Sequence, residues 1–317
     1  MTQRRFGSES TAYEVVQGLD LHGKRAIVTG GASGLGRETA WALAQVGAEV
    51  TILVRSLDQG KAWVQEMREA NLSYAVAAEQ VDLSDYGSVR NCARRLLDRG
   101  EAIDILVNNA GIMACPLERN AQGHELHFAT NHLGHFLLTL ELLPLLQEGA
   151  PARVVMVSSA AHRRTPILFE DIHFERHPYD KWLAYAQSKT ANALFALELN
   201  RRYGPDIEAF AVNPGRSITR LMRYLTVTEM QELGWLDRWG KRLPGFKSAE
   251  QGAATATWAA TAPELSGHGG SYLENCDFAG PLQWEAVLGI APHIQDVEAA
   301  ERLWQVSEQM VNEPAEA

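Results

Sequence analysis

The strongest constraint in this sequence is a regular alternation of short apolar segments with longer helical segments, which runs up to residue 212. The short segments are rich in Val, Ile and Leu, and they predict strands at residues 25–29, 49–54, 74–81, 103–107, 153–157 and 207–212. The segments between them predict helices at residues 35–46, 57–70, 84–99, 122–146 and 182–203. Strands that alternate with helices favour a parallel sheet covered on both faces. Right-handed crossovers then give an α/β fold, a single doubly wound parallel sheet of about seven strands with helices on both faces.

The alternation breaks after Pro214, and the remaining residues are expected to decorate one core. The later predicted elements are a helix at 248–261, a short seventh strand near 270–273 and an amphipathic helix at 297–311. A chain of 317 residues, 46% of them hydrophobic, fits one large domain. We therefore expect a single domain over residues 1–317, with an N-terminal extension at 1–20, a substrate lid at 216–247 and a C-terminal extension at 280–317.

Charge and cysteine content exclude several classes of protein. The chain has 29 Lys and Arg against 39 Asp and Glu, a net charge of −10, so no nucleic-acid partner is expected. Its three widely spaced cysteines form no metal or redox motif and indicate free thiols in a reducing compartment. The longest apolar stretch, residues 136–146, is interrupted by a glutamate and a proline, so we expect no membrane span. The first residues lack the apolar core of a secretory signal, and we expect a cytoplasmic protein.

A glycine-rich turn follows the first predicted strand and opens the first long helix. Gly30, Gly34 and Gly36 have a GxxxGxG spacing within residues 29–36. Glycines let the backbone approach a pyrophosphate closely, and the free N–H groups of a helix N-terminus bind it. The strand–turn–helix context favours a dinucleotide site over the alternative, a tight turn without a ligand.

The end of the second predicted strand bears on the choice of cofactor. A carboxylate at this place would bind the adenosine ribose and repel a 2′-phosphate, but the strand ends in Val54, Arg55 and Ser56. Arg55 can form charge-assisted hydrogen bonds with a 2′-phosphate, assisted by Ser56 or Ser33. We therefore favour NADP(H) over NAD(H). The alternative is that Arg55 is a surface residue on the adenine face, in which case either cofactor binds.

Tyr185 and Lys189 are four residues apart in a predicted helix, so their side chains share one face. A nearby ammonium group favours the phenolate and is expected to lower the pKa of Tyr185 towards the working pH. A tyrosine of this kind can give a proton to a carbonyl oxygen or take one from an alcohol.

Other polar or glycine motifs end the neighbouring predicted strands. The carboxyl ends of parallel strands meet along one rim, where α/β sheets bind ligands. The motifs are Ser158-Ser159, Asn108-Asn109-Ala110-Gly111 and Asn213-Pro214-Gly215. Asn131 lies inside the predicted helix 122–146, where an inward-facing polar side chain needs a partner.

In combination, these motifs closely resemble the short-chain dehydrogenase/reductase family, in its single-domain branch with a GxxxGxG turn. The resemblance covers about residues 22–275 and implies a Rossmann fold. Residues 131–136 (NHLGHF), 157–162 (VSSAAH) and 185–192 are most similar to the subgroup of retinol dehydrogenases and WW-domain oxidoreductases. The residues Glu301-Arg302-Leu303-Trp304 are similar as well.

The resemblance implies a role for each matching residue. Tyr185 is implied as general acid/base, Lys189 as the residue that lowers its pKa and holds the nicotinamide ribose, and Ser159 as the group that polarises the substrate oxygen. Asn131 is implied to hold a water in a proton relay to Lys189. The implied cofactor-binding residues are Gly30, Ser33, Gly34, Leu35, Gly36, Arg55, Asp82, Leu83, Asn109, Ala110, Gly111, Tyr185, Lys189, Pro214, Gly215 and Thr219.

The sequence departs from the family pattern in two places. Ser217 replaces the usual aliphatic residue, and Arg216 is bulkier than is common, so Arg216 could reach a substrate carboxylate or the cofactor phosphates. We also expect no hydrophobic N-terminal anchor of the kind that the membrane-bound relatives carry, which argues against a membrane-retinoid role.

Two further patterns have more than one interpretation. His124, His127, His132 and His135 invite a metal site, but the last two belong to the NHLGHF motif, so we expect structural histidines and no metal. Trp235 and Trp239 could form the core of the lid, line an apolar substrate pocket, or do both.

We therefore predict an NAD(P)-dependent oxidoreductase that transfers a hydride between NADP(H) and the carbonyl/alcohol pair of a fairly apolar small molecule. A non-catalytic nucleotide sensor or scaffold of the same fold is the alternative from another class. A sugar-nucleotide epimerase or dehydratase is disfavoured by the glycine spacing and by the lack of a large C-terminal substrate domain. The resemblance also implies a homodimer or homotetramer, packed through the helices at 122–146 and 182–203.

Overall fold

One eight-stranded sheet organises the residues that the computed structural model describes, which are 6–71 and 73–314. Its strands are β1 (Arg25–Thr29), β2 (Glu49–Val54), β3 (Val76–Gln80), β4 (Ile105–Asn108), β5 (Ala152–Val157), β6 (Ile207–Asn213), β7 (Tyr272–Glu274) and β8 (Asp277–Phe278). Their order is β3-β2-β1-β4-β5-β6-β7-β8, with all pairs parallel except β7–β8. The strand order reverses between β1 and β4, and ligands bind at such switch points. The doubly wound sheet is confirmed, and β8 is one antiparallel strand more than expected.

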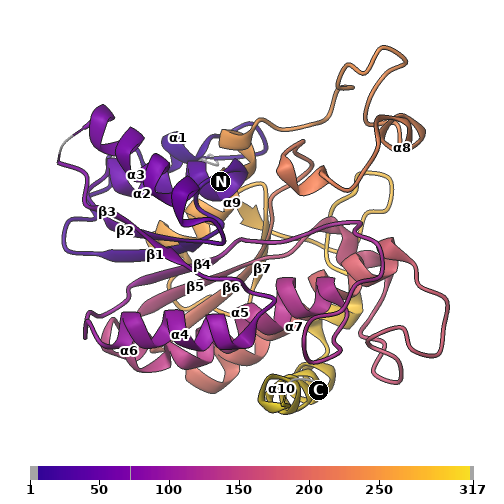
Figure 1. The fold of residues 1–317 in the computed structure, drawn as a ribbon. Helices are drawn as coiled ribbons and strands as arrows, with labels where there is room; N and C mark the ends of the chain where they lie inside the picture. Colours follow the sequence, from indigo (N-terminus) through magenta and orange to yellow (C-terminus); the bar gives the residue numbers. More distant parts are fainter. Residues whose placement is uncertain (1–5, 72, 315–317) are drawn as a thin grey trace.

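Helices cover both faces of this sheet (Figure 1). They are α1 (Ala12–Val16), α2 (Gly34–Gln45), α3 (Leu57–Ala70), α4 (Tyr86–Leu97), α5 (Gly134–Glu141), α6 (Leu143–Glu148), α7 (Lys181–Tyr203), α8 (Val227–Glu232), α9 (Ala249–Thr261) and α10 (Val297–Asn312). Apolar side chains of α2, α3 and α9 pack on one face of the sheet. Those of α4, α5, α7 and α10 form the core on the other face.

The prediction of one helix over residues 122–146 is wrong. The segment forms a π-helical turn at Phe128–Leu133, then α5, then α6, which has a proline in its first turn. A β-carbon on Gly134 would lie 2.2 Å from the carbonyl oxygen of Leu83, so glycine lets α5 cross the end of β3 closely. The wider turn before this crossing contains Asn131, and π-turns of this kind are frequent at functional sites.

The last helix, α10, packs along α7 and α5 (Figure 1). The buried indole of Trp304 lies 5.1 Å from the ring of Phe136 and 5.7 Å from that of Phe195, measured between ring centres. Arg202 stacks over the same indole at 4.5 Å. This face of α7 is therefore buried within the chain, although the helix at 182–203 was expected to take part in subunit packing. The oligomer itself stays a prediction.

Both predicted extensions pack onto the core where they are described. Ala12 and Val16 of α1 are buried against Ala42 of α2 and Ala253 of α9. Residues 1–5 of the expected N-terminal extension and 315–317 of the C-terminal one lie outside the described residues. Among the helices that are described, none is long and apolar enough to cross a membrane.

Residues 216–247, the expected lid, leave the carboxyl end of β6 and project from the body of the domain (orange in Figure 1). They contain a 3-10 turn at Arg220–Met222 and the short helix α8. A bridge between Ser217 and Lys247 brings the two ends of the segment together. This bridge ties the base of the segment to the rim of the sheet, and an ion pair between Glu229 of α8 and Lys181 ties its middle to the start of α7.

Candidate active site

A cavity of about 450 Å³ opens at the carboxyl ends of the strands, at the switch point of the sheet. All but two of the residues predicted for catalysis or cofactor binding line it, although they come from seven parts of the chain. The lining residues among them are Gly30, Ser33, Gly34, Leu35, Arg55, Asp82, Leu83, Asn109, Ala110, Gly111, Ser159, Tyr185, Lys189, Pro214, Gly215 and Thr219. The two that do not line it are Gly36 and Asn131.

The glycine turn has the geometry of a phosphate site. Gly30 and Gly34 have φ angles of +68° and +57°, which favour glycine. Ser33 precedes α2 without capping it through its side chain, so the first N–H groups of the helix face the cavity. A β-carbon on Gly36 would lie 2.4 Å from Nδ2 of Asn109, so Gly36 allows α2 to pack against the end of β4. The turn therefore fits a dinucleotide pyrophosphate.

Thr29, which the sequence analysis did not single out, fixes the rim between β1 and β4. Its Oγ1 accepts hydrogen bonds from the backbone N–H groups of Asn109 (2.8 Å) and Ala110 (2.9 Å). The Asn109 side chain donates back to the Thr29 carbonyl at 2.9 Å. The sequence signal that could have identified Thr29 is its position directly before the first glycine of the turn.

The adenosine end of the cavity is lined by Arg55 and Ser56 from the end of β2. The Arg55 side chain is exposed, and no ion pair found in the described ranges engages its guanidinium. Asp82 accepts from the backbone N–H and the hydroxyl of Ser84, so its carboxylate orders the turn after β3. Among the described residues, the guanidinium of Arg55, directly after β2, is thus a positive charge without an ion pair at this end of the cavity.

Tyr185 and Lys189 of α7 are both buried beside the cavity, but they do not contact each other directly. The ammonium Nζ of Lys189 donates to the Val157 carbonyl at 2.8 Å and lies 5.8 Å from the centre of the Tyr185 ring. Burial raises the pKa of Tyr185 to about 12, a rise that hydrogen bonding with Ser159 partly offsets. Burial lowers the pKa of Lys189 to about 7. The expected lowering of the tyrosine pKa by the lysine is therefore not found: burial dominates the pKa of Tyr185, and the lowering contribution comes from Ser159 instead of Lys189.

The backbone carbonyl of Ser159 accepts hydrogen bonds from two side chains that follow it in the chain. The His162 imidazole donates to the Ser159 carbonyl at 2.7 Å, and the Tyr272 hydroxyl donates to it at 3.2 Å. His162 is buried, and its other ring nitrogen accepts from the backbone N–H of Ala291. The C-terminal segment thus supports the end of β5 that carries Ser159.

Asn131 connects the end of β4 to α7 instead of facing the cavity. Its Oδ1 accepts from the Ile112 N–H at 2.8 Å, and its Nδ2 donates to the Ile112 carbonyl at 3.0 Å and to Ser188 Oγ at 2.9 Å. Its own carbonyl, in the π-turn, accepts from His135 Nδ1 at 2.9 Å. These contacts position Lys189, one residue beyond Ser188, while a role in a proton relay stays a prediction.

The base of the lid adds residues that the sequence analysis missed. Thr219 lies beside Gly34, as expected, and Arg220 and Arg223 also line the cavity. Arg216, by contrast, stacks over the Phe246 ring at 5.3 Å and is not among the lining residues. Only the fold of the lid distinguishes these arginines, since their spacing in the sequence carries no signal.

An apolar cluster surrounds Tyr185 on the side of the lid. Its buried members besides Tyr185 are Met113, Ala114, Met222 and Leu225, and Trp235 and Phe246 pack against them. Trp239 lies outside this cluster, with its side chain 74% exposed. Of the two lid tryptophans, Trp235 therefore belongs to the lid core and Trp239 does not.

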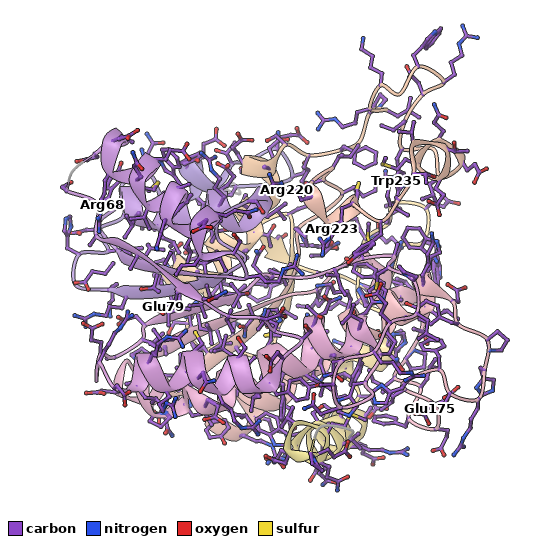
Figure 2. All side chains as sticks on the ribbon, in the orientation of Figure 1. Arg68, Glu79, Glu175, Arg220, Arg223 and Trp235 are labelled. Atoms are coloured by element: carbon purple, nitrogen blue, oxygen red, sulfur yellow. The ribbon has the colours of Figure 1, made fainter. Side chains whose placement is uncertain are left out.

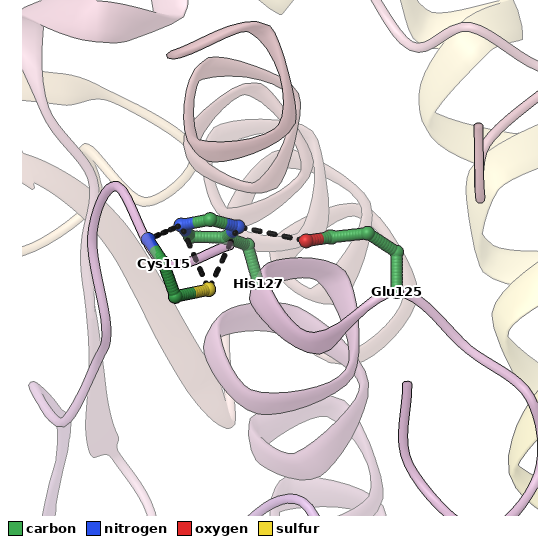
Figure 3. A group of neighbouring side chains, drawn as sticks. All are labelled: Cys115, Glu125 and His127. Carbon is green, nitrogen blue, oxygen red and sulfur yellow. Dashed lines mark hydrogen bonds and ion pairs between the residues drawn. The ribbon is translucent and has the colours of Figure 1, made fainter. Parts of the chain in front are cut away.

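A buried group of Cys115, Glu125 and His127 adjoins this cluster (Figure 3). Nδ1 of His127 donates to Glu125 at 2.7 Å, and Nε2 accepts from the Cys115 backbone N–H at 3.4 Å. The Cys115 sulfur lies 3.5 Å from both ring nitrogens. An atom in the ring plane cannot be this close to both without overlapping a ring carbon, so the sulfur lies over the face of the imidazole. The free lone pair of the ring, on Nε2, lies in the ring plane and therefore does not point at the sulfur, whereas a Cys–His nucleophile requires it to point at the thiol and a metal held by both groups would have to lie on its axis.

The other histidines of this region have separate partners. His124 lies against Tyr86 and Glu313, His132 against Ser307, and His135 against Thr29 and Asn131. Burial lowers the pKa of His132 to about 3 and that of His135 to about 4. His132 and His135 are therefore neutral, and all three histidines take part in hydrogen bonds of the core.

Comparison with known proteins agrees with the geometry of this site. A family profile described as short chain dehydrogenase matches residues 24–229. A probable oxidoreductase of Streptomyces antibioticus is 47% identical over 292 residues, which cover 90% of this chain and 97% of that protein. Human retinol dehydrogenase 12 is 38% identical over 290 residues, covering 91% of this chain and 86% of the relative.

Solved structures show the same fold. An uncharacterised protein from Mycobacterium paratuberculosis is similar with a TM-score of 0.71 and 33% identity, over 96% of this chain and 98% of that one. The RhlG/NADP active-site complex of Pseudomonas aeruginosa has a TM-score of 0.62 and 26% identity, over 80% of this chain and 95% of that one. The glycine turn, the rim residues and these relatives together establish that the chain belongs to the short-chain dehydrogenase/reductase family of NAD(P)-dependent oxidoreductases.

Proposed function

We propose that this protein transfers a hydride between NADP(H) and the carbonyl/alcohol pair of a fairly apolar small molecule. The observation that carries the proposal is the meeting of Ser159, Tyr185 and Lys189 with the glycine turn in one cavity. The cofactor supplies the hydride when it is bound. Preference for NADP(H) is supported by the exposed Arg55 at the adenosine end.

In the proposed mechanism, Ser159 and Tyr185 stabilise the charge that develops on the substrate oxygen, and Tyr185 supplies the proton. A tyrosine with a pKa of about 12 is protonated at neutral pH, which suits the donor role in carbonyl reduction. Lys189 holds the nicotinamide ribose. Asn131, through Ser188 and Ile112, positions this part of α7 against the rim of the sheet.

The substrate is proposed to be apolar because apolar side chains enclose Tyr185 on the lid side. Residues 216–247 are proposed to act as the substrate lid of a single domain. We further propose that the protein acts in the cytoplasm as a homodimer or homotetramer. The names of the retinol dehydrogenase relatives are consistent with an apolar alcohol or aldehyde.

The test is the absorbance change at about 340 nm that reports NADPH oxidation, measured with a panel of apolar ketones and aldehydes and repeated with NADH. We expect turnover with one chemical class, a preference for NADPH, and loss of turnover in Tyr185→Phe with cofactor affinity retained. Near-normal turnover in Tyr185→Phe would overturn the mechanism. Tight cofactor binding without turnover across the panel would favour a nucleotide sensor instead.

A further inference from the structure

The outer part of the lid has a composition unlike the rest of the chain. We call residues 233–243 the lid tip. It exposes Leu233 (39%), Trp239 (74%) and Leu243 (37%), which are large apolar side chains. Its three cations, Arg238, Lys241 and Arg242, outnumber its one acid, Asp237, so its net charge is 3 − 1 = +2 in a chain of net charge −10.

Hydrogen bonds hold the lid tip in a defined shape. The Asp237 carboxylate accepts from the backbone N–H groups of Trp239 (2.9 Å) and Lys241 (2.8 Å). The Asp237 N–H donates to the Lys241 carbonyl, and the Leu243 N–H donates to the Trp235 carbonyl, so the strands of a short hairpin are paired. Trp239 therefore stands at the turn of a built hairpin, and its exposure follows from that fold.

The two sides of this hairpin differ. Trp235, on the inner side, lies 6.1 Å from the rings of both Trp182 and Phe246 and belongs to the apolar cluster around Tyr185. The far end of the lid extends away from the domain, with long side chains directed outward beyond Trp235 (Figure 2). One segment thus joins the apolar wall of the active site to an exposed apolar and basic end.

We propose that the lid tip docks this protein onto an anionic phospholipid surface. Tryptophan and leucine side chains partition into the headgroup region, and Lys and Arg are attracted to acidic lipids. The rest of the molecule has a net charge of −10 − 2 = −12, so an anionic membrane repels it on balance and attracts this positive end, which favours docking through the lid tip. The lid, whose inner side contributes to the apolar wall of the active site, then lies next to the lipid, where apolar alcohols and aldehydes dissolve.

An acidic protein is the other partner that such a charge would fit. A specific protein interface buries about 800 Å² on each partner, and a projecting hairpin with three exposed apolar side chains offers less. Insertion into a headgroup layer needs no complementary surface. The shape of the lid tip therefore favours lipid over protein.

The test uses the full chain without cofactor or substrate, so its outcome is independent of the proposed reaction. Binding is measured by co-sedimentation with phosphatidylcholine vesicles that contain or lack phosphatidylserine, at low and at high salt. We expect binding only with phosphatidylserine, weakened by salt. Trp239→Ala with Leu243→Ala, and separately Lys241→Glu with Arg242→Glu, should each weaken binding at least about tenfold.

The matched control is Lys61→Glu with Arg68→Glu on α3, which changes the net charge equally at the opposite end of the molecule (Figure 2 labels Arg68). This control should retain at least half of the binding of the unchanged protein. Circular dichroism and thermal unfolding check that every variant is folded. The proposal is overturned if the unchanged protein does not bind phosphatidylserine vesicles, which would leave an acidic protein as partner, or if the control loses binding as strongly as the lid-tip variants.

Discussion

The Lys189 ammonium group donates to the Val157 carbonyl at 2.8 Å, while the Tyr185 ring that it is thought to assist is centred 5.8 Å from it. The lysine is almost fully buried, and no carboxylate in the described ranges forms an ion pair with it. Burial of an unpaired cation lowers its pKa and costs stability. The protein therefore keeps a group that folding disfavours, as expected for the role proposed above for Lys189.

Lys189→Met should stabilise the protein by about 1–2 kcal/mol near pH 6, while abolishing turnover. The pKa of Lys189 is about 7 in the folded state against 10.5 ordinarily. Between these values the unfolded state binds more protons, so the unfolding free energy of the unchanged protein rises with pH. The advantage of the variant should therefore shrink from pH 7 towards pH 10. Urea unfolding across this range checks it, with exposed Lys61→Met as control; a pH-independent advantage would contradict the buried-charge explanation.

Arg55→Ala should lower kcat/KM for NADPH by about 10–100-fold, because charge-assisted hydrogen bonds to the 2′-phosphate contribute about 1.5–3 kcal/mol. The value for NADH should change little, since that cofactor has no phosphate at this place. Steady-state kinetics with both cofactors measure the ratio. Arg68→Ala, on the exposed face of α3, serves as control. Equal losses with both cofactors would show that Arg55 contacts the adenine instead.

Glu125→Gln should destabilise the protein by about 1.5–3 kcal/mol, because a neutral amide oxygen accepts the hydrogen bonds from His127 and from the Phe128 N–H more weakly than a carboxylate does. Hydrogen bonds from His127 and the Phe128 N–H lower the pKa of Glu125. Its stabilising contribution is thus complete above the ordinary carboxyl pKa and is lost as the pH falls through the lowered one. Chemical unfolding between pH 7 and pH 3 measures this.

The matched control is Tyr179→Phe, which removes only a hydroxyl 3.1 Å from Glu125 and should cost about 1 kcal/mol. KM should rise in Glu125→Gln more than kcat falls, because His127 anchors the backbone beside Ala114 in the apolar cluster. A loss of kcat alone would indicate a direct role in the reaction.

Trp304→Ala should cost about 3–5 kcal/mol, because it removes a buried ring that packs against α5 and α7. Trp284→Ala removes a 65% exposed ring that Arg163 stacks on, and should cost about 0.5 kcal/mol or less. Thermal unfolding compares the two. Similar losses would mean that α10 contributes little to holding α7.

The parts of the fold that depend on hydrophobic periodicity or on the spacing of glycines could be predicted from the sequence. Strands β1 to β7 and the glycine turn at Gly30 follow from local patterns, because each buried strand or tight turn constrains its own residues. The π-turn that contains Asn131 could not, and neither could the close approach of Gly134 to Leu83, which comes from another part of the chain. The two-residue strand β8 is likewise too short to leave a pattern.

The candidate site likewise has a part that the sequence could predict and a part that it could not. Motifs at strand ends pointed to the residues that line the cavity, since the carboxyl ends of parallel strands must meet. The contacts around the site connect residues that are separated in the sequence. Examples are the hydrogen bond between Cys115 and His127 and the stacking of Arg216 on Phe246, and no regular sequence spacing predicts either of them. The pKa of Tyr185 differed from expectation for the same reason, because its burial arises from the lid as well as from its own helix.

The packing of α10 on α7 has a consequence for how the chain folds during synthesis. The ribosome synthesises Tyr185 and Lys189 more than a hundred residues before α10. The outer face of α7 therefore stays exposed after strands β1 to β6 have been synthesised, until α10 can pack on it. Its exposed apolar face, including Phe195, is in that interval a target for chaperones and for aggregation. The helix that carries the proposed chemistry is therefore among the last parts of the domain to become fully ordered.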